Sequence, residues 1–277
     1  MTVAEALRAA SLRLAATGDT ARLDAELLMA HALGVSRSDM LLHHGSAEVP
    51  RGFDAMLERR SACEPVAYIT GETEFYGRPF AVAPGVLIPR GDSETVVEAA
   101  LDCAPEPGRV LDLGTGSGCL LLTVLAERPA AGGVGVDALP DAIQLAERNS
   151  EALGLADRAS LELRDWSQRR WSEGLGTFDL VIANPPYVEV DAALDRQVRD
   201  HEPGTALFAG PEGLDDYRLL LPQLGGLLSE SGVAVFEIGA GQADAVGALA
   251  RAQGLAATLR RDLAGRPRAL ILRRAAG

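Results

Sequence analysis

The residues with the clearest capacity for chemistry form the tetrapeptide Asn184-Pro185-Pro186-Tyr187, which follows the apolar run 178–183. The run is short and mostly aliphatic, so it predicts a buried strand that the two prolines end. Proline fixes its own φ angle, lacks an amide hydrogen and keeps the preceding residue extended, so we expect Asn184 in a rigid loop. That loop would lie at the carboxyl edge of a sheet, where open α/β folds bind their ligands. Taken alone, the tetrapeptide also fits an ordinary strand that stops at proline.

A glycine-rich turn carries the second group of candidate residues. It follows an earlier predicted strand that contains Asp112, and its residues are Gly114, Thr115, Gly116, Ser117 and Gly118. Glycines between a strand and a helix let backbone amides approach a ligand closely at the helix N-terminus. The G-x-G-x-G spacing after an acidic residue is typical of S-adenosylmethionine-dependent methyltransferases rather than of nicotinamide-binding folds. We therefore predict that these five residues bind S-adenosylmethionine.

Two further strand ends offer side chains that suit a nucleoside. Asp137 closes the second strand about 20 residues beyond the glycine turn, where a carboxylate accepts hydrogen bonds from ribose hydroxyls. Asp165 and Trp166 close the third strand, where a carboxylate can accept an adenine amino hydrogen and an indole can cover the ring. The alternatives are a helix N-cap for Asp137 and a plain core position for Trp166. The glycine turn, Asp137 and the Asp165-Trp166 pair each stand at a strand end, and together they favour a nucleoside cofactor site.

A methyl sulfonium beside the tetrapeptide would give it a chemical role. The nitrogen of an amide, or of an exocyclic amine on a base, is a poor nucleophile because its lone pair is delocalised. Its two hydrogens must point at acceptors that stabilise the growing positive charge, and the Asn184 side-chain oxygen and the Pro185 carbonyl can provide them. Tyr187 can lie over the planar group. We expect Asn184, Pro185 and Tyr187 to be catalytic and the stretch with Pro186 to bind the substrate. The motif alone leaves open whether the acceptor is a base or a glutamine.

The elements that must position these residues follow a regular order along the chain. Residues 2–60 have a helical pattern, and the aromatic, β-rich runs 64–69 and 74–82 predict a hairpin around Gly77-Arg78. After residue 91, strands and helices alternate, which predicts a parallel sheet covered on both faces. The expected strands are 110–113, 134–137, 160–164, 178–183, 233–238, 257–261 and 269–272, and the last two are expected to pair antiparallel. The expected helices between them are 118–127, 141–153, 213–228 and 242–253, with a loop from the tetrapeptide to residue 210.

The predicted fold class is therefore α/β. We expect a Rossmann-like, seven-stranded methyltransferase sheet that is mostly parallel with an antiparallel last strand. A small N-terminal helical bundle would be joined to it by a β-hairpin. The predicted domains are a helical substrate-docking domain at 1–62, a β-hairpin connector at 63–90 and an S-adenosylmethionine-binding domain at 91–277.

Composition limits the classes of function. The chain of 277 residues has a net charge of −13, and all 26 of its basic residues are arginine. The absence of lysine excludes lysine Schiff-base chemistry and a phosphate-loop lysine. An acidic chain is also poorly suited to grip nucleic acid by its phosphates. Separated cysteines, scattered histidines and the absence of a membrane-length apolar run predict a cytoplasmic protein without a metal site or a membrane span. We expect it to be a monomer.

Motifs along nearly the whole chain resemble the bacterial peptide chain release factor glutamine-N5 methyltransferases. They are Glu64-Pro65, Ala67-Tyr68-Ile69, Glu74-Phe75-Tyr76-Gly77, Leu87-Ile88-Pro89-Arg90, the turn from Asp112 to Gly118, Asn184-Pro-Pro-Tyr187, Glu202-Pro203, Ala206-Leu207-Phe208, Gly213-Leu214-Asp215, Glu237-Ile238-Gly239 and Asp262-Leu263-Ala264-Gly265 with Arg268. The chain departs from the family pattern at two positions. It has Gly91 after Ile-Pro-Arg, and it has Cys63 where the family has glycine before Glu-Pro.

The resemblance implies methylation of the glutamine in the Gly-Gly-Gln motif of class I peptide chain release factors, with S-adenosylmethionine as the methyl donor. It implies cofactor contacts at residues 114–118, Asp137, Trp166 and Asn184, and substrate contacts at residues 184–187. The N-terminal bundle is then expected to grip the release factor.

Two other functions compete with this interpretation. One is an adenine-N6 or guanine-N2 methyltransferase acting on DNA or RNA, because Asn-Pro-Pro-Tyr also suits a flipped base. The net charge of −13 and the lack of a basic, aromatic-rich segment argue against stable nucleic acid binding. The other is a binding protein that keeps the fold without the chemistry. The intact glycines and the intact tetrapeptide argue against it.

Overall fold

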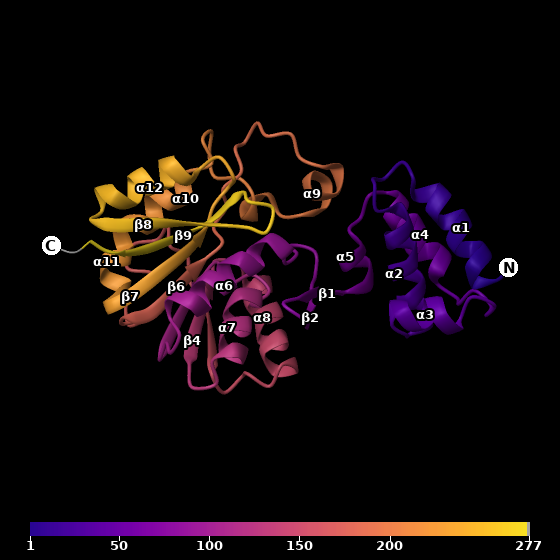
Figure 1. Cartoon of the computed structure of the whole chain (residues 1–277), viewed down its shortest axis with the longest axis horizontal. Helices are drawn as coiled ribbons and strands as arrows, with labels where there is room; N and C mark the ends of the chain where they lie inside the picture. The colour runs from indigo at the N-terminus through magenta and orange to yellow at the C-terminus, as the bar shows by residue number, and fades with distance from the viewer. Residues whose placement is uncertain (276–277) are drawn as a thin grey trace. The chain divides into compact units, whose positions relative to one another are not determined.

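The computed structural model describes residues 1–275 and divides into two compact units. The first unit consists of Met1–Glu72 together with the later segment Leu194–Glu202. Of the described residues, the second unit consists of Thr73–Ala193 and 203–275. Figure 1 shows helices throughout the first unit and a twisted sheet between helices in the second. No helix within residues 1–275 is long and apolar enough to cross a membrane.

The first unit is a small helical bundle. Its helices are α1 (Val3–Leu14), α2 (Ala21–Leu33), α3 (Arg37–His43), α4 (Phe53–Ser61), α5 (Val66–Thr70) and α9 (Arg196–His201). Thr2 and Glu5 form the capping box that their spacing predicts, because each side chain accepts a hydrogen bond from the other residue's backbone N–H. The core of the bundle contains the fully buried side chains of Leu14, Leu28, Met29, Met40 and Phe53.

Two short helices of this unit differ from the sequence prediction. The run 64–69, predicted as part of the hairpin, contains α5, which Pro65 precedes and which Gly71 ends in a left-handed conformation. Its β-branched and aromatic residues favour a strand, but local turn chemistry at both ends determines the structure. Helix α9 lies in the predicted loop after the tetrapeptide. None of its side chains is buried, so it lacks the apolar stripe by which a helix is predicted.

The two departures from the family pattern have different structural consequences. Cys63 adopts a φ angle of 67°, in the left-handed region that glycine occupies without strain. A side chain there costs about 1 to 2 kcal/mol, which accounts for glycine at this position in the family pattern. Gly91 instead begins a short 3₁₀ helix, η1 (Gly91–Ser93). The next residue, Glu94, is held in place because its carboxylate accepts the Tyr76 backbone N–H at 2.8 Å.

The second unit contains the predicted seven-stranded sheet and, apart from Glu72, a hairpin around Gly77-Arg78 that is shorter than the predicted one. The hairpin strands are β1 (Glu72–Phe75) and β2 (Arg78–Ala81), and the sheet strands are β3 (Arg109–Leu113), β4 (Gly132–Asp137), β5 (Ala159–Leu163), β6 (Phe178–Ala183), β7 (Leu228–Glu237), β8 (Leu255–Arg261) and β9 (Pro267–Arg274). The strand order is β5-β4-β3-β6-β7-β9-β8. Strands β3 to β7 are parallel, whereas β9 runs antiparallel to both β7 and β8. The prediction of a mostly parallel sheet with an antiparallel last strand is confirmed.

Helices cover both faces of this sheet. Helices α6 (Glu94–Cys103), α7 (Cys119–Glu127) and α8 (Pro140–Ala152) lie on one face, and α10 (Asp215–Leu220), α11 (Leu224–Leu227) and α12 (Ala243–Ala252) lie on the other (Figure 1). The single helix predicted for 213–228 is divided into α10, a 3₁₀ turn η3 (Leu221–Gln223) and α11. Pro222 in that turn lacks the amide hydrogen that a continuous helix needs.

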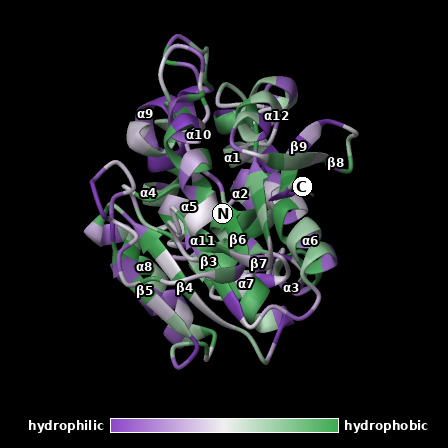
Figure 2. Ribbon diagram, turned by 90° about the vertical axis from the view of Figure 1, so that its left-hand side faces the viewer, coloured by the Kyte–Doolittle hydropathy of each residue, from purple (hydrophilic) through white to green (hydrophobic). Residues whose placement is uncertain are grey.

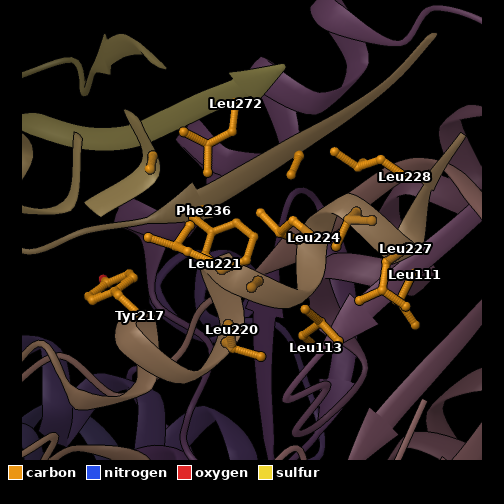
Figure 3. Packing of buried hydrophobic residues seen from close by; sticks show 14 of the residues in the cluster. Leu111, Leu113, Tyr217, Leu220, Leu221, Leu224, Leu227, Leu228, Phe236 and Leu272 are labelled. Carbon is orange, nitrogen blue, oxygen red and sulfur yellow. The ribbon is translucent and has the colours of Figure 1, made fainter. Parts of the chain in front are cut away.

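Side chains of the central strands alternate between two apolar cores. On β6, Leu180 and Ile182 face the core under α6 and α7, whereas Val181 and Ala183 face the core under α10 to α12. Figure 3 shows the second core, which includes Leu111, Leu113, Tyr217, Leu220, Leu224, Phe236 and Leu272. Figure 2 shows hydrophobic colouring along β6 and β7. Burial on both faces explains why the sequence before the tetrapeptide is almost wholly apolar.

Candidate active site

A cavity of about 300 Å³ lies at the carboxyl ends of β3, β4 and β6. The strand order reverses between β3 and β6, and open α/β sheets bind ligands at such a reversal. Six of the residues predicted for cofactor or substrate line this cavity: Gly114, Gly116, Asp137, Trp166, Asn184 and Pro186. Asp165 lines it as well. Segments that are far apart in the sequence therefore meet at one site, as the strand-end argument predicts.

The glycine turn between β3 and α7 is hydrogen-bonded to the end of β4. The backbone N–H groups of Gly114 and Thr115 both donate to the Val136 carbonyl at 2.9 Å. The Asp137 carboxylate accepts the Gly116 N–H at 2.9 Å on one oxygen and the Leu139 N–H at 3.0 Å on the other. Burial raises the pKa of Asp137. Asp137 thus holds the turn and the start of α8 while it also lines the cavity.

Trp166 forms part of the cavity wall between Gly114 and α10. A Cβ atom on Gly114 would lie only 3.0 Å from the indole ring, so glycine is what allows the ring to approach the turn. The indole N–H donates to the Asp216 Oδ1 atom at 2.9 Å. Asp216 also lines the cavity, and burial raises its pKa. The indole is therefore held by a hydrogen bond at one edge and by close packing at the other.

Asp165, the neighbour of Trp166, is held mainly by its own loop. Its carboxylate accepts the Ser167 N–H at 2.8 Å and the Gln168 side-chain N–H at 3.2 Å. The hydrogen bonds from Ser167 hold the pKa of Asp165 below its ordinary value. Asp165 is thus an ionised acceptor at neutral pH on the wall of the cavity.

Five of the predicted site residues do not line this cavity: Thr115, Ser117, Gly118, Pro185 and Tyr187. Thr115 and Ser117 are buried. The Thr115 hydroxyl donates to Asp112 at 2.7 Å. Gly118 lies against Leu122 of α7, where a Cβ atom would come within 2.9 Å of that side chain. These turn residues shape the backbone behind the cavity wall.

Asp112, the acidic residue before the glycine turn, is fully buried. One carboxylate oxygen accepts the Thr115 hydroxyl, and the other has no hydrogen-bond partner in the part of the chain that the structure describes. Burial raises the pKa of Asp112 to about 7. Folding therefore favours the protonated acid, and the stability that this provides is lost as the pH rises from the unfolded pKa of about 4 towards 7.

An Asp112→Asn variant should lack this pH dependence. We expect its free energy of unfolding, relative to the wild type, to increase by about 2 to 3 kcal/mol between pH 5 and pH 7 because each pKa unit corresponds to 1.36 kcal/mol. Urea unfolding of both proteins at several pH values measures this difference. Carboxyl groups elsewhere are common to both proteins and cancel. A difference that is constant with pH would contradict the raised pKa of Asp112.

Asn184 and Tyr187 share a buried polar network that sequence reasoning did not include. The Asn184 side-chain N–H donates to the Ser93 hydroxyl oxygen at 3.3 Å, and the Ser93 hydroxyl donates to Glu237 Oε2 at 2.5 Å. The Tyr187 hydroxyl donates to Glu237 Oε1 at 3.1 Å. Burial raises the pKa of Glu237, whereas the hydrogen bond from Ser93 and the charge of Arg268 oppose that rise. The only indication in the sequence is an acidic residue at the end of an apolar strand.

The cavity fits S-adenosylmethionine in its chemistry. Val86, Leu139 and Ala142 provide apolar wall, and Asp137 and Asp165 provide acceptors for hydroxyl and amino hydrogens. Trp166 provides an aromatic surface for a base. Within residues 1–275, no group of three or more His, Cys, Asp or Glu side chains is arranged to hold a metal ion.

Comparisons with known families and structures agree with this arrangement. Residues 5–71 match the family model described as PrmC N-terminal domain, and residues 106–206 match one described as methyltransferase domain. A solved methyltransferase from Pyrococcus furiosus has a TM-score of 0.54 and 15% identity, covering 72% of this chain and 89% of its own. An O-methyltransferase family protein from Burkholderia thailandensis has a TM-score of 0.50 and 20% identity, covering 68% and 57%. These likenesses concern the fold alone.

The fold and the cavity define a Rossmann-like methyltransferase that uses S-adenosylmethionine as methyl donor. A release factor glutamine methyltransferase from Cereibacter sphaeroides is 43% identical over 281 residues, which cover 99% of this chain and 99% of that protein. Another protein of that name, from Rhodospirillum rubrum, is 42% identical over 92% of this chain and 79% of its own length. The chain belongs to the release factor glutamine methyltransferase family.

Proposed function

We propose that this protein transfers the methyl group of S-adenosylmethionine to the side-chain amide nitrogen of the glutamine in the Gly-Gly-Gln motif of class I peptide chain release factors. The observation that carries the proposal is that Asn184 and Pro186 line the same cavity as Gly114, Asp137 and Trp166. The acceptor motif and the candidate cofactor residues are therefore adjacent. The names of the curated relatives support the substrate class.

The cofactor residues act by binding and orientation. The bound donor supplies an electrophilic methyl group on a sulfonium. We assign the ribose hydroxyls to Asp137, the face of the adenine to Trp166 and the adenine amino group to Asp165. The backbone of Gly114 and Gly116 would lie against the donor, and residues 115, 117 and 118 would keep that backbone in place from behind the wall.

The tetrapeptide acts on the acceptor nitrogen. The Asn184 side-chain oxygen and the Pro185 carbonyl would accept the two amide hydrogens of the glutamine and fix its nitrogen towards the methyl group. Tyr187 would lie against the planar amide. The nitrogen lone pair forms the new N–C bond as the S–C bond breaks, and the electron pair of the S–C bond stays on sulfur. The methylated nitrogen then loses one proton to solvent, so no side-chain base is required.

The first unit would dock the release factor, and the enzyme would act as a cytoplasmic monomer without stable nucleic acid binding. The match of residues 5–71 to an N-terminal domain model of this family supports the docking role. The net charge of −13 supports the absence of nucleic acid binding, and the free thiols of Cys63, Cys103 and Cys119 suit a reducing compartment. Light scattering that gives a dimer mass at micromolar concentration would contradict the monomer.

Incubation with methyl-labelled S-adenosylmethionine tests the proposed function. We expect label in a purified class I release factor and none in a matched release factor whose Gly-Gly-Gln glutamine is replaced by glutamate. Mass spectrometry of the labelled peptide should place one added methyl group on that glutamine side chain. Total DNA and RNA in parallel reactions provide the comparison. Label found only in nucleic acid would reject the proposed function.

A further inference from the structure

A network of hydrogen-bonded side chains connects the cavity wall to the carboxylate of one buried residue, Glu237. Its members are Asn184, Ser93, Glu237 and Tyr187, and they come from three separate segments of the second unit. Ala183 pairs with Phe236 in the parallel β6 and β7 ladder, so Asn184 and Glu237 are neighbouring strand-end residues. Glu237 is 1% exposed and Ser93 is 2% exposed. Ser93 and Glu237 are therefore shielded from water, whereas Asn184 and Tyr187 are partly buried. The hydrogen bonds among the four side chains determine how they are oriented.

The direction of each hydrogen bond in this network is set by Glu237. An ionised carboxylate only accepts hydrogen bonds, whereas a serine hydroxyl has one hydrogen to donate. The Ser93 hydrogen is used on Glu237 Oε2, so the Ser93 oxygen can only accept from Asn184. Of the two ends of the Asn184 amide, the NH₂ group must then face Ser93. The side-chain oxygen remains for the cavity.

The same carboxylate also holds Tyr187. Its Oε1 atom accepts the Tyr187 hydroxyl at 3.1 Å, so one buried group supports two residues of the tetrapeptide. Burial raises the pKa of Glu237, and the hydrogen bonds from Ser93 and Tyr187 and the charge of Arg268 act against that rise. In its ionised form, Glu237 also places a negative charge next to the tetrapeptide, which is the sign that stabilises a nitrogen on which positive charge develops.

We propose that Glu237 is a positioning residue for methyl transfer, which acts through Ser93 to keep the Asn184 oxygen towards the acceptor amide and acts directly on Tyr187. This inference rests on the proposed function because it assumes that Asn184 is an acceptor for the substrate hydrogens. Glu237 does not line the cavity, so its effect reaches the substrate through other side chains. The inference explains why an acidic residue follows the buried apolar run 232–236 at the end of β7.

Glu237→Gln tests the inference with little change in shape. Ser93 donates to Oε2 and Tyr187 to Oε1, and a glutamine replaces one of these two oxygens by an NH₂ group that cannot accept. We expect kcat to fall by about 10- to 100-fold, as for loss of one or two buried hydrogen bonds, while the Kd for S-adenosylmethionine changes less than about threefold. Ser93→Ala should lower kcat by a similar factor because the Asn184 amide is then free to turn.

The double variant distinguishes orientation from general damage. Glu237→Gln and Ser93→Ala disturb the same amide, so the loss in the double variant should be well below the product of the two single losses. Tyr217→Phe is the matched control. The Tyr217 hydroxyl donates to the backbone carbonyl of Glu237 at 2.7 Å and leaves the carboxylate untouched. We expect this control to lower the thermal midpoint but to keep the wild-type kcat.

Several results would overturn the inference. Wild-type kcat in Glu237→Gln or in Ser93→Ala, or multiplicative losses in the double variant, would remove Glu237 from the positioning of Asn184. A parallel fall in kcat, cofactor affinity and thermal midpoint would show a purely structural role. If Glu237→Gln does not fold, Ser93→Ala alone decides the matter. A wild-type enzyme that leaves the release factor unmethylated would reject the proposed function itself, whereas an active wild type with unaffected variants would reject this inference only.

Discussion

Replacement of Asn184 by alanine is expected to lower kcat for methyl transfer by about 100- to 1,000-fold, the usual cost of removing one preorganised group at a reacting centre. The amide is the polar side chain of the tetrapeptide that lines the cavity, and its NH₂ group is already used on Ser93. Its oxygen is therefore the atom that is available to the glutamine. Without that oxygen, the glutamine nitrogen that receives the methyl group is no longer oriented. The positive charge that develops on this nitrogen also loses its hydrogen-bond acceptor.

Cofactor binding should be affected far less by the same change. Asp137, Trp166 and the turn at Gly114 are held by contacts that do not involve Asn184. We expect the Kd for S-adenosylmethionine, measured by calorimetry, to rise by less than about tenfold, which is about 1.4 kcal/mol. Asn184→Asp is the matched control because it keeps an acceptor oxygen although it loses the donor to Ser93, and it should lose less activity than the alanine variant. Wild-type kcat in Asn184→Ala would exclude Asn184 from the mechanism.

The site residues at the ends of strands were predictable because short stretches of sequence indicate where these strands end. The apolar run before Asn184 and the glycines at 114 and 116 each indicate a strand that ends at a ligand-binding edge. In a parallel sheet the carboxyl ends of the strands lie at one edge, so the residues that follow them are close together. The structure confirms the sheet with its antiparallel last strand, and it brings Asp137, Trp166 and Asn184 to one cavity. Which of these residues contact the donor stays a prediction.

The remaining part depends on contacts between distant segments. Ser93 is 144 residues from Glu237 in sequence, and Trp166 is 50 residues from Asp216, so no local pattern indicates either pair. The short helices were missed for a related reason. Val66–Thr70 has too few residues for a period, and Arg196–His201 buries no side chain. Periodicity predicts an element only where that element has a buried face long enough to repeat.

Replacement of Gly213 by alanine should disturb both the stability and the activity of the enzyme. Gly213 has a φ angle of 65°, and a Cβ atom there would lie 2.3 Å from the Tyr187 carbonyl oxygen. Gln242 ties the two residues together because its side-chain NH₂ group donates to the Tyr187 and Gly213 carbonyls at 3.0 Å each. The added methyl group must therefore displace the backbone immediately after the two prolines. We expect a lower kcat because Tyr187 moves with that backbone.

Gly254→Ala separates the effect of the contact from that of the backbone conformation. Gly254 has a similar φ angle of 73°, but a Cβ atom there would meet nothing within 4 Å. We expect Gly254→Ala to lower the free energy of unfolding by about 1 to 2 kcal/mol, the cost of a side chain in the left-handed region, and to leave kcat unchanged. Gly213→Ala should cost a further 1 to 3 kcal/mol or so, the usual range for overpacking. Urea unfolding of the two variants measures the difference. Equal losses of unfolding free energy in the two variants would mean that a side chain at position 213 does not crowd the Tyr187 carbonyl. Gly213→Ala would then have no reason to lower kcat.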